Sequence, residues 1–172
     1  MTIRAKRQET SPSFGFAPVA GDDARILVLG SLPGQRSLSE GEYYAHPQNG
    51  FWRIMRELVG AAGTYEERCN ALVENRIALW DVLASSIRRG SMDADIRAEN
   101  AEVNDFSGFF RTHGHVRIIG FNGQKAAQLF ARLVDEHLQD TIDRTIVLPS
   151  TSPAYASMSL AEKLDRWRSL LE

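Results

Sequence analysis

The chain of 172 residues contains a single cysteine, Cys69, and no long apolar run. One cysteine excludes an internal disulfide, a thiolate zinc site and a four-cysteine iron–sulfur cluster, and it favours a reducing compartment. We therefore expect a cytoplasmic protein. No stretch approaches the roughly 20 apolar residues that a membrane helix needs, and no apolar segment follows the basic residues near the N-terminus. We expect neither a membrane span nor a signal peptide.

A strong charge of either sign is also lacking, because 20 Lys and Arg residues stand against 22 Asp and Glu residues. The chain has no overall positive field that would indicate a nucleic-acid partner, although a local basic patch can bind nucleic acid on a neutral protein. The length suits one domain with a substantial core. The polar residues 1–22 are interpreted as an N-terminal tail that packs, if at all, through Phe14 and Phe16, and residues 23–172 as a single domain.

Four short apolar runs are predicted to be strands: residues 25–30, 77–83, 116–121 and 144–149. Nearly every residue in them is aliphatic or β-branched, which is typical of strands covered on both faces.

Apolar residues with helical spacing lie between these runs and after the last one. They predict a helix that starts near Asn49, a weaker one over residues 65–74, and three more. The apolar stripes are Phe51, Met55, Leu58 and Val59; Val103, Phe106, Phe109 and Phe110; Ala126, Ala127, Phe130, Leu133 and Val134; and Leu160, Leu164, Trp167 and Leu171. The alternation predicts an α/β fold, a three-layer α/β/α sandwich with a short, mainly parallel central sheet.

Polar motifs follow each predicted strand, at GSLPG (30–34), WDVL (80–83), GFNGQ (120–124) and LPSTSPA (148–154). In open parallel sheets, ligands bind outside the carboxyl ends of the strands. The pattern therefore predicts one binding site at this edge. GSLPG lacks the Lys and Ser/Thr of a P-loop and is not GxGxxG, so it supports neither nucleotide hydrolysis nor dinucleotide binding. It is either a strand-ending turn or a loop whose N–H groups bind an oxygen or a phosphate.

Several single residues allow two interpretations each. Asn49 stands where a helix N-cap would, but its amide could instead hold a water molecule. Asp81 could accept a hydrogen bond from a ligand or orient neighbouring backbone. Tyr44 could stack on a base, whereas we expect Tyr43 to be buried under the loop. His46, before a proline, is best interpreted as a hydrogen-bonded loop residue, with an acid or a phosphate contact as the alternatives.

GSLPG followed by YYAHPQNGFW, then ALWDVL, GFNGQKA and LPSTSPA, resembles the uracil-DNA glycosylase superfamily, most nearly its hypoxanthine (deoxyinosine) branch. The resemblance extends over about residues 25–171 and implies a three-layer α/β/α fold. It implies that residues 23–172 are a glycosylase-like domain acting, as a monomer, on double-stranded DNA with a deaminated base. It implies no cofactor and no metal.

The resemblance also implies roles for individual residues. Asn49 would be catalytic and position a water molecule, Tyr44 would stack on the flipped base, and Asp81 would recognise it. His46 and Asn122 would support the site. The remaining positions form two groups, a base-pocket wall of Ser31, Leu32, Pro33 and Gly34, and a DNA-backbone contact of Ser150, Thr151, Ser152 and Pro153.

Two departures from the family pattern bear on the substrate. Leu32 stands where uracil-specific relatives carry Asp or Asn, and Leu148 stands where they usually carry His or Asn. These positions favour hypoxanthine over uracil. None of the residues to which the resemblance assigns a role is a lysine, so the product is expected to be an abasic site without a lyase step. A mismatch-type uracil-DNA glycosylase and a catalytically inactive nucleic-acid-binding module of the same fold remain alternatives, and hydrolysis of free nucleosides is a weaker one.

Overall fold

The central element of the fold is a parallel sheet of four strands in the order β3-β2-β6-β7. The computed structural model describes residues 11–88 and 92–172. The strands are β2 (Ile26–Gly30), β3 (Ile77–Asp81), β6 (Ile118–Asn122) and β7 (Arg144–Leu148). Three of these strands lie inside predicted apolar runs, and β6 extends one residue beyond its run. The prediction of a parallel sheet is therefore confirmed.

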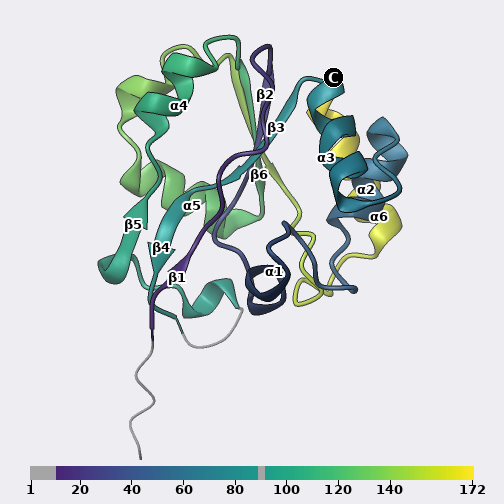
Figure 1. Ribbon diagram of the computed structural model, residues 1–172, viewed down its shortest axis with the longest axis horizontal. Coiled ribbons are helices and arrows are strands. Elements are labelled where there is room, and N and C mark those ends of the chain that lie inside the picture. Colours follow the sequence, from purple (N-terminus) through teal and green to yellow (C-terminus); the bar gives the residue numbers. More distant parts are fainter. Residues whose placement is uncertain (1–10, 89–91) are drawn as a thin grey trace, which may run out of the picture.

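Helices cover both faces of this sheet and complete the predicted three-layer α/β/α sandwich. The helices are α1 (Gln35–Glu40), α2 (Phe51–Val59), α3 (Tyr65–Glu74), α4 (Phe106–Thr112), α5 (Gln124–Leu133) and α6 (Leu160–Trp167). Helices α4 and α5 lie on one face and α2, α3 and α6 on the other (Figure 1). None of the helices within the described residues is long and apolar enough to cross a membrane.

Two helix predictions need correction. Val103 does not join the α4 stripe, because the Asp105 side chain accepts a hydrogen bond from the Gly108 N–H and starts the helix at Phe106. Val103 instead ends a short strand and is 37% exposed. Leu171 lies beyond α6 and the 3-10 turn that follows it, and it is exposed. Helix α1 was not predicted, because QRSLSE has no apolar stripe.

The strand predicted over residues 77–83 is divided between two sheets. After β3 ends at Asp81, strand β4 (Leu83–Ser86) joins a small antiparallel sheet with β1 (Ser13–Phe14) and β5 (Ala101–Val103). The chain therefore changes sheets directly after Asp81.

The N-terminal segment that was expected to be a tail is partly built into the fold, and residues 1–10 lie outside the described residues. Val19 and Leu79 exchange two backbone hydrogen bonds of 2.9 and 2.8 Å. Phe16 packs edge-on against Tyr43, with ring centroids 5.2 Å apart. Phe14 does not pack, since it is 63% exposed.

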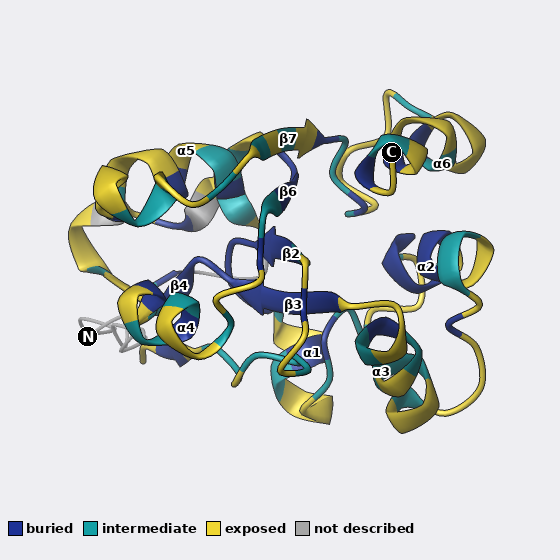
Figure 2. Ribbon diagram, turned by 90° about the horizontal axis from the view of Figure 1, so that it is seen from above, coloured by how far each residue is buried: buried dark blue, intermediate teal, exposed yellow. Residues whose placement is uncertain are grey.

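Burial differs between the centre and the edge of the parallel sheet. Strands β2 and β3 are buried, whereas β7 alternates with exposed residues and its Val147 is 46% exposed (Figure 2). The expectation of cover on both faces is therefore wrong for β7, because β7 is the edge strand of the sheet.

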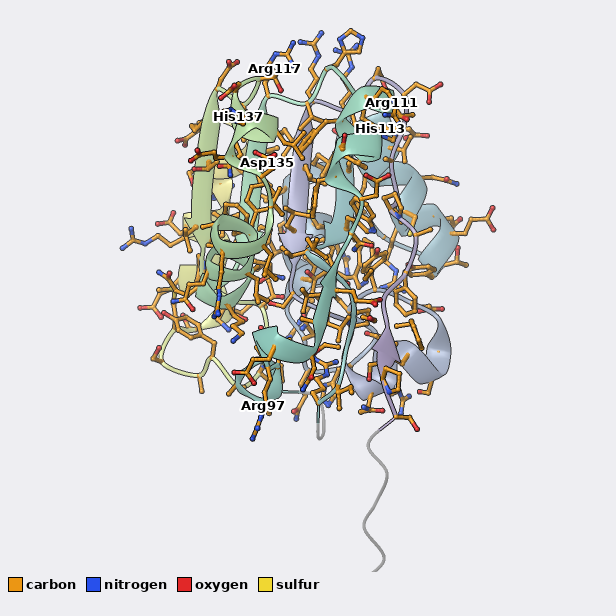
Figure 3. All side chains as sticks on the ribbon, turned by 90° about the vertical axis from the view of Figure 1, so that its left-hand side faces the viewer. Arg97, Arg111, His113, Arg117, Asp135 and His137 are labelled. Atoms are coloured by element: carbon orange, nitrogen blue, oxygen red, sulfur yellow. The ribbon has the colours of Figure 1, made fainter. Side chains whose placement is uncertain are left out.

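The two ends of the sandwich carry different side chains. Arg111, His113, Arg117 and His137 gather at one end and Arg97 lies at the other (Figure 3). His113 follows the last residue of α4, and its Nδ1 bonds to the Phe109 carbonyl at 3.1 Å. The carboxyl ends of the parallel strands point away from these histidines, towards α1 (Figure 1).

Candidate functional site

A cavity of about 680 Å³ opens at the carboxyl ends of the parallel strands. It lies where connections leave β2 and β6 towards opposite sides of the sheet, the usual ligand position in open α/β folds. The cavity is lined by every residue for which the sequence predicted a site role: Ser31, Leu32, Pro33, Gly34, Tyr44, His46, Asn49, Asp81, Asn122, Ser150, Thr151, Ser152 and Pro153.

The GSLPG loop forms a fixed wall of this cavity. The Gly30 carbonyl accepts a hydrogen bond from the Val82 N–H at 2.8 Å, and the Ser31 carbonyl accepts one from the Leu83 N–H at 3.1 Å. The buried Arg88 guanidinium donates to the Pro33 carbonyl. These bonds extend the pairing of β2 and β3 into the loop, so its shape is set by the sheet.

Tyr44 has a left-handed backbone, with φ of 54°. This conformation is uncommon for a bulky residue. Its ring stacks on Phe51, with centroids 4.2 Å apart and planes inclined by 27°, so Phe51 covers one face of the ring. The Tyr44 hydroxyl is buried and has no hydrogen-bond partner among the described residues. Burial, and then the nearby Asp81 charge, raise the pKa of Tyr44.

Tyr43 points the other way and is 3% exposed. Its hydroxyl donates to the Ala17 carbonyl at 2.9 Å, and its own carbonyl accepts a hydrogen bond from the Trp52 indole at 2.8 Å. The prediction that Tyr43 is buried under the loop is confirmed.

Asp81 ends β3 at the floor of the cavity and is 4% exposed. Its Oδ2 has no hydrogen-bond partner among the described residues. Burial, and then the negative charge of Asp93, raise the pKa of Asp81 to about 7, against the opposing effect of the Arg88 guanidinium. A carboxyl group that titrates near neutral pH can act as either a donor or an acceptor towards a ligand.

Gly30 makes room for this floor. A β-carbon at residue 30 would lie 2.8 Å from the Tyr44 hydroxyl oxygen and closer still to Asp81 Oδ1. A side chain at this position would therefore displace both oxygens. The glycine lets the ends of β2 and β3 and the Tyr44 hydroxyl meet at one point.

Asn49 lies one residue before the N-cap of α2, which is Gly50, so the N-cap prediction is wrong by one residue. Its Oδ1 accepts a hydrogen bond from the Phe51 N–H at 2.9 Å, while Gly50, the residue at the N-cap position, provides no side-chain bond. Asn49 also lines the cavity and is half-buried. The bond to Phe51 fixes the amide plane, and because an amide is not a base, it can hold a water molecule but cannot deprotonate it.

His46 is exposed at the rim, where its Nδ1 accepts a hydrogen bond from the Gln48 N–H at 3.1 Å. The preferred interpretation of His46 as a hydrogen-bonded loop residue is confirmed.

The loop of residues 150–155 is anchored to the end of β6. The Asn122 amide donates to the Thr151 hydroxyl and accepts a hydrogen bond from the Thr151 backbone N–H, and Thr151 is 1% exposed. The role of Thr151 in the DNA contact stays a prediction. The Ser150 and Ser152 hydroxyls accept backbone N–H bonds of 3.2 Å from Ser152 and Ala154, which leaves each O–H to donate outward.

Asp93 and Lys125 also line the cavity, and the sequence did not predict them as site residues. Asp93 begins a 3-10 turn without apolar periodicity, and its carboxylate accepts a hydrogen bond from the Ser31 hydroxyl at 3.3 Å. Lys125 Nζ donates to the Ile96 carbonyl at 3.3 Å. The sequence signals for Lys125 were its place within the GFNGQKA motif and its positive charge close to the predicted site. Within the described ranges, no group of three or more His, Cys, Asp or Glu residues is placed to hold a metal ion.

Comparison with known proteins identifies similar sequences and similar structures. A family model described as the uracil DNA glycosylase superfamily matches residues 18–171. A hypoxanthine DNA glycosylase of Methanosarcina acetivorans is 39% identical over 143 residues, which are 81% of this chain and 86% of that protein. One of Methanosarcina barkeri is 38% identical over 117 residues, 66% of this chain and 73% of that protein. A solution NMR structure from M. acetivorans, described as a candidate uracil DNA glycosylase, has a TM-score of 0.75 and 35% identity, covering 94% of this chain and all of that one.

Proposed function

Because the chain belongs to the uracil DNA glycosylase superfamily, we propose that it is a monofunctional DNA glycosylase that excises hypoxanthine from double-stranded DNA and acts as a monomer. The names of the two Methanosarcina relatives support the substrate. The observation that carries the proposal is the unpartnered Asp81 carboxylate oxygen at the floor of a cavity that the motif residues line. A cytoplasmic location stays a prediction.

Asp81 suits the recognition of a deaminated purine. Deamination of adenine replaces the amino group at C6 with a carbonyl and turns N1 from an acceptor into an N–H donor. An ionised Asp81 accepts that N1–H, whereas adenine offers it only a lone pair, so the wrong base leaves the buried carboxylate without a partner. The face of the Tyr44 ring that Phe51 leaves uncovered is assigned to stacking on the extruded base.

The reaction is a hydrolysis at the sugar carbon C1′. The bond between C1′ and N9 breaks and its electron pair leaves with the base. A water molecule held by Asn49 adds to C1′, and its proton passes to solvent. The walls formed by Ser31, Leu32, Pro33 and Gly34 keep other water from the base, and Asn122 and His46 support the surrounding loops. Ser150, Ser152 and Pro153 are assigned to the DNA backbone.

The test uses matched duplexes that contain one deoxyinosine or one deoxyuridine, followed by alkali and a denaturing gel. Alkali-dependent scission of the inosine strand alone is the expected result. Scission of the uracil strand alone would identify a uracil glycosylase, a reading that the description of the similar NMR structure favours. Intact strands in both lanes, with retained DNA binding, would contradict glycosylase activity and leave the binding-module alternative. Size-exclusion chromatography would check the monomer.

Lys125 makes the monofunctional assignment testable, since a cavity lysine is the group that a lyase would use to form a Schiff base. Its ammonium group donates to the Ile96 carbonyl, so we expect no attack on the sugar. Borohydride should therefore trap no covalent protein–DNA adduct on the inosine duplex, and scission should require alkali. A trapped adduct that disappears in Lys125→Ala would contradict this assignment.

A further inference from the structure

Lys163 is a buried cation outside the cavity lining. It lies on α6 and is 6% exposed. Its Nζ donates to the Ser152 carbonyl at 3.3 Å and lies 5.2 Å from the centre of the Tyr155 ring. Both contacts are with the 150–155 loop, which runs between α6 and the end of the molecule where α1 lies (Figure 1).

The positive charge of Lys163 has no anionic partner among residues 11–88 and 92–172. None of the ion pairs between described residues includes Lys163. Burial lowers the pKa of its ammonium group. A carbonyl and an aromatic face compensate a buried charge only in part, and lysine is rarely buried without an anionic partner. An apolar side chain of similar length would fill the same space without this cost, so packing alone does not explain a lysine here.

The contacts of Lys163 indicate where an anion would come from. Ser152 and Tyr155 both line the mouth of the cavity, and Tyr155 is 40% exposed. The Ser152 hydroxyl accepts the Ala154 N–H and leaves its own hydrogen to donate outward. A phosphate at this loop would lie near both the Ser152 hydroxyl, which can donate, and the positive charge of Lys163.

We propose that Lys163 is a phosphate-binding residue whose ammonium group pairs with a DNA backbone phosphate seated on the 150–155 loop. The inference deepens the proposed function and rests on it only in requiring that the chain bind DNA. The pairing supplies the missing counter-charge on complex formation, and it adds one counterion-releasing contact to the interface.

The salt dependence of DNA binding separates this role from a purely structural one. Each phosphate contact adds about 0.9 to the slope of log affinity against log salt. Fluorescence anisotropy of an undamaged duplex between 50 and 200 mM salt should therefore give a slope about 0.9 smaller for Lys163→Gln than for the wild-type chain. Over this fourfold range the wild-type protein should lose about 3.5-fold more affinity than the variant. Lys163→Arg should keep the full slope.

Arg166→Gln provides the matched control, because it removes one charge from an exposed position on the same helix. Its slope should equal that of the wild-type chain. Lys163→Met keeps an unbranched stem and serves as a second neutral variant if Lys163→Gln does not fold. A loss of affinity that is the same at every salt concentration, with an unchanged slope, would show that Lys163 only supports the loop and would overturn the proposal.

The outcomes distinguish this proposal from the proposed function. Inosine excision by the wild-type chain, together with an unchanged salt slope in Lys163→Gln, would contradict the phosphate contact and support the glycosylase function. A reduced salt slope in Lys163→Gln, without excision of inosine by the wild-type chain, would support the phosphate contact and contradict the glycosylase function. Absence of DNA binding by the wild-type chain would overturn both.

Discussion

Asn122 and Thr151 exchange two hydrogen bonds, one from Asn122 Nδ2 to Thr151 Oγ1 and one from the Thr151 N–H to Asn122 Oδ1, each 2.9 Å long. Both side chains are buried, and they are 29 residues apart in the chain. The pair holds the 150–155 loop against the end of β6, so one wall of the cavity depends on it. The Thr151 carbonyl continues the connection by accepting a hydrogen bond from the Gly50 N–H, beside Asn49.

Thr151→Val should destabilise the fold and loosen this wall. The substitution keeps the shape of the side chain but leaves Asn122 Nδ2 buried without its acceptor, at a cost of about 1–3 kcal/mol. Thr151→Ser, which retains the hydroxyl, is the control. Urea unfolding and inosine excision measure the two effects. An equal stability of Thr151→Val and Thr151→Ser would show that the hydrogen bond does not hold the loop.

Asn49→Ser should separate capping from catalysis. A serine hydroxyl can also accept a hydrogen bond from the backbone N–H two residues on, so the serine variant should unfold at nearly the same urea concentration as the wild-type chain. It is too short to hold the water, and excision of inosine should fall by about 100-fold. Asn49→Ala should lose both the excision and about 1 kcal/mol of stability. Retained excision in Asn49→Ser would show that Asn49 only supports the start of α2.

Tyr44→Phe tests the ring apart from the hydroxyl. The variant removes a buried hydroxyl that makes no well-formed hydrogen bond to the described residues, although the Asn122 side chain lies near it, so its stability should stay close to that of the wild-type chain. It keeps the stacking surface, so excision should fall far less than in Tyr44→Ala. Thermal unfolding and single-turnover kinetics on the inosine duplex give both values. Equal excision by Tyr44→Ala and the wild-type chain would show that the ring does not contact the base.

Asp81 should make stability and activity change in opposite directions with pH. The pKa of Asp81 is about 7 in the folded protein. The pKa of an aspartate in an unfolded chain is about 3.9. The folded state therefore binds more protons in this window. The stability contribution is full below about pH 4 and is lost as the pH rises through about 7, by up to about 1.4 kcal/mol per pH unit.

Inosine excision should instead rise through about pH 7, since the ionised carboxylate is the acceptor for N1–H. Asp81→Asn keeps an acceptor oxygen and should flatten both profiles. The measurements are urea unfolding and kcat/KM across pH 5 to 8. A wild-type excision rate that falls through pH 7 would mean that the protonated carboxyl acts, as a donor.

The sequence predicted the parallel sheet well because its strands are continuous apolar runs, and a buried strand needs such a run whatever its neighbours are. It also predicted which motifs meet, because the carboxyl ends of parallel strands share one edge. It did not predict the small sheet, since β1 has only two residues and pairs with residues more than 70 positions away. The pairing of Asn122 with Thr151 could not be predicted either, because these residues are also far apart in the chain. A hydrogen bond between side chains from distant loops leaves no periodic signal.

The segment 13–19 lies beyond the cavity lining, yet it bears on the aromatic residues near the cavity. The Phe16 carbonyl accepts a hydrogen bond from the Trp80 indole at 3.0 Å, and the Ala17 carbonyl accepts one from the Tyr43 hydroxyl. Trp80 immediately precedes Asp81, and Tyr43 immediately precedes Tyr44. A version of the protein trimmed to residue 23 would remove both acceptors and the Phe16 ring that packs on Tyr43, one residue away from Asp81 and Tyr44. The N-terminal segment therefore supports the strand end and the loop that carry these two cavity residues.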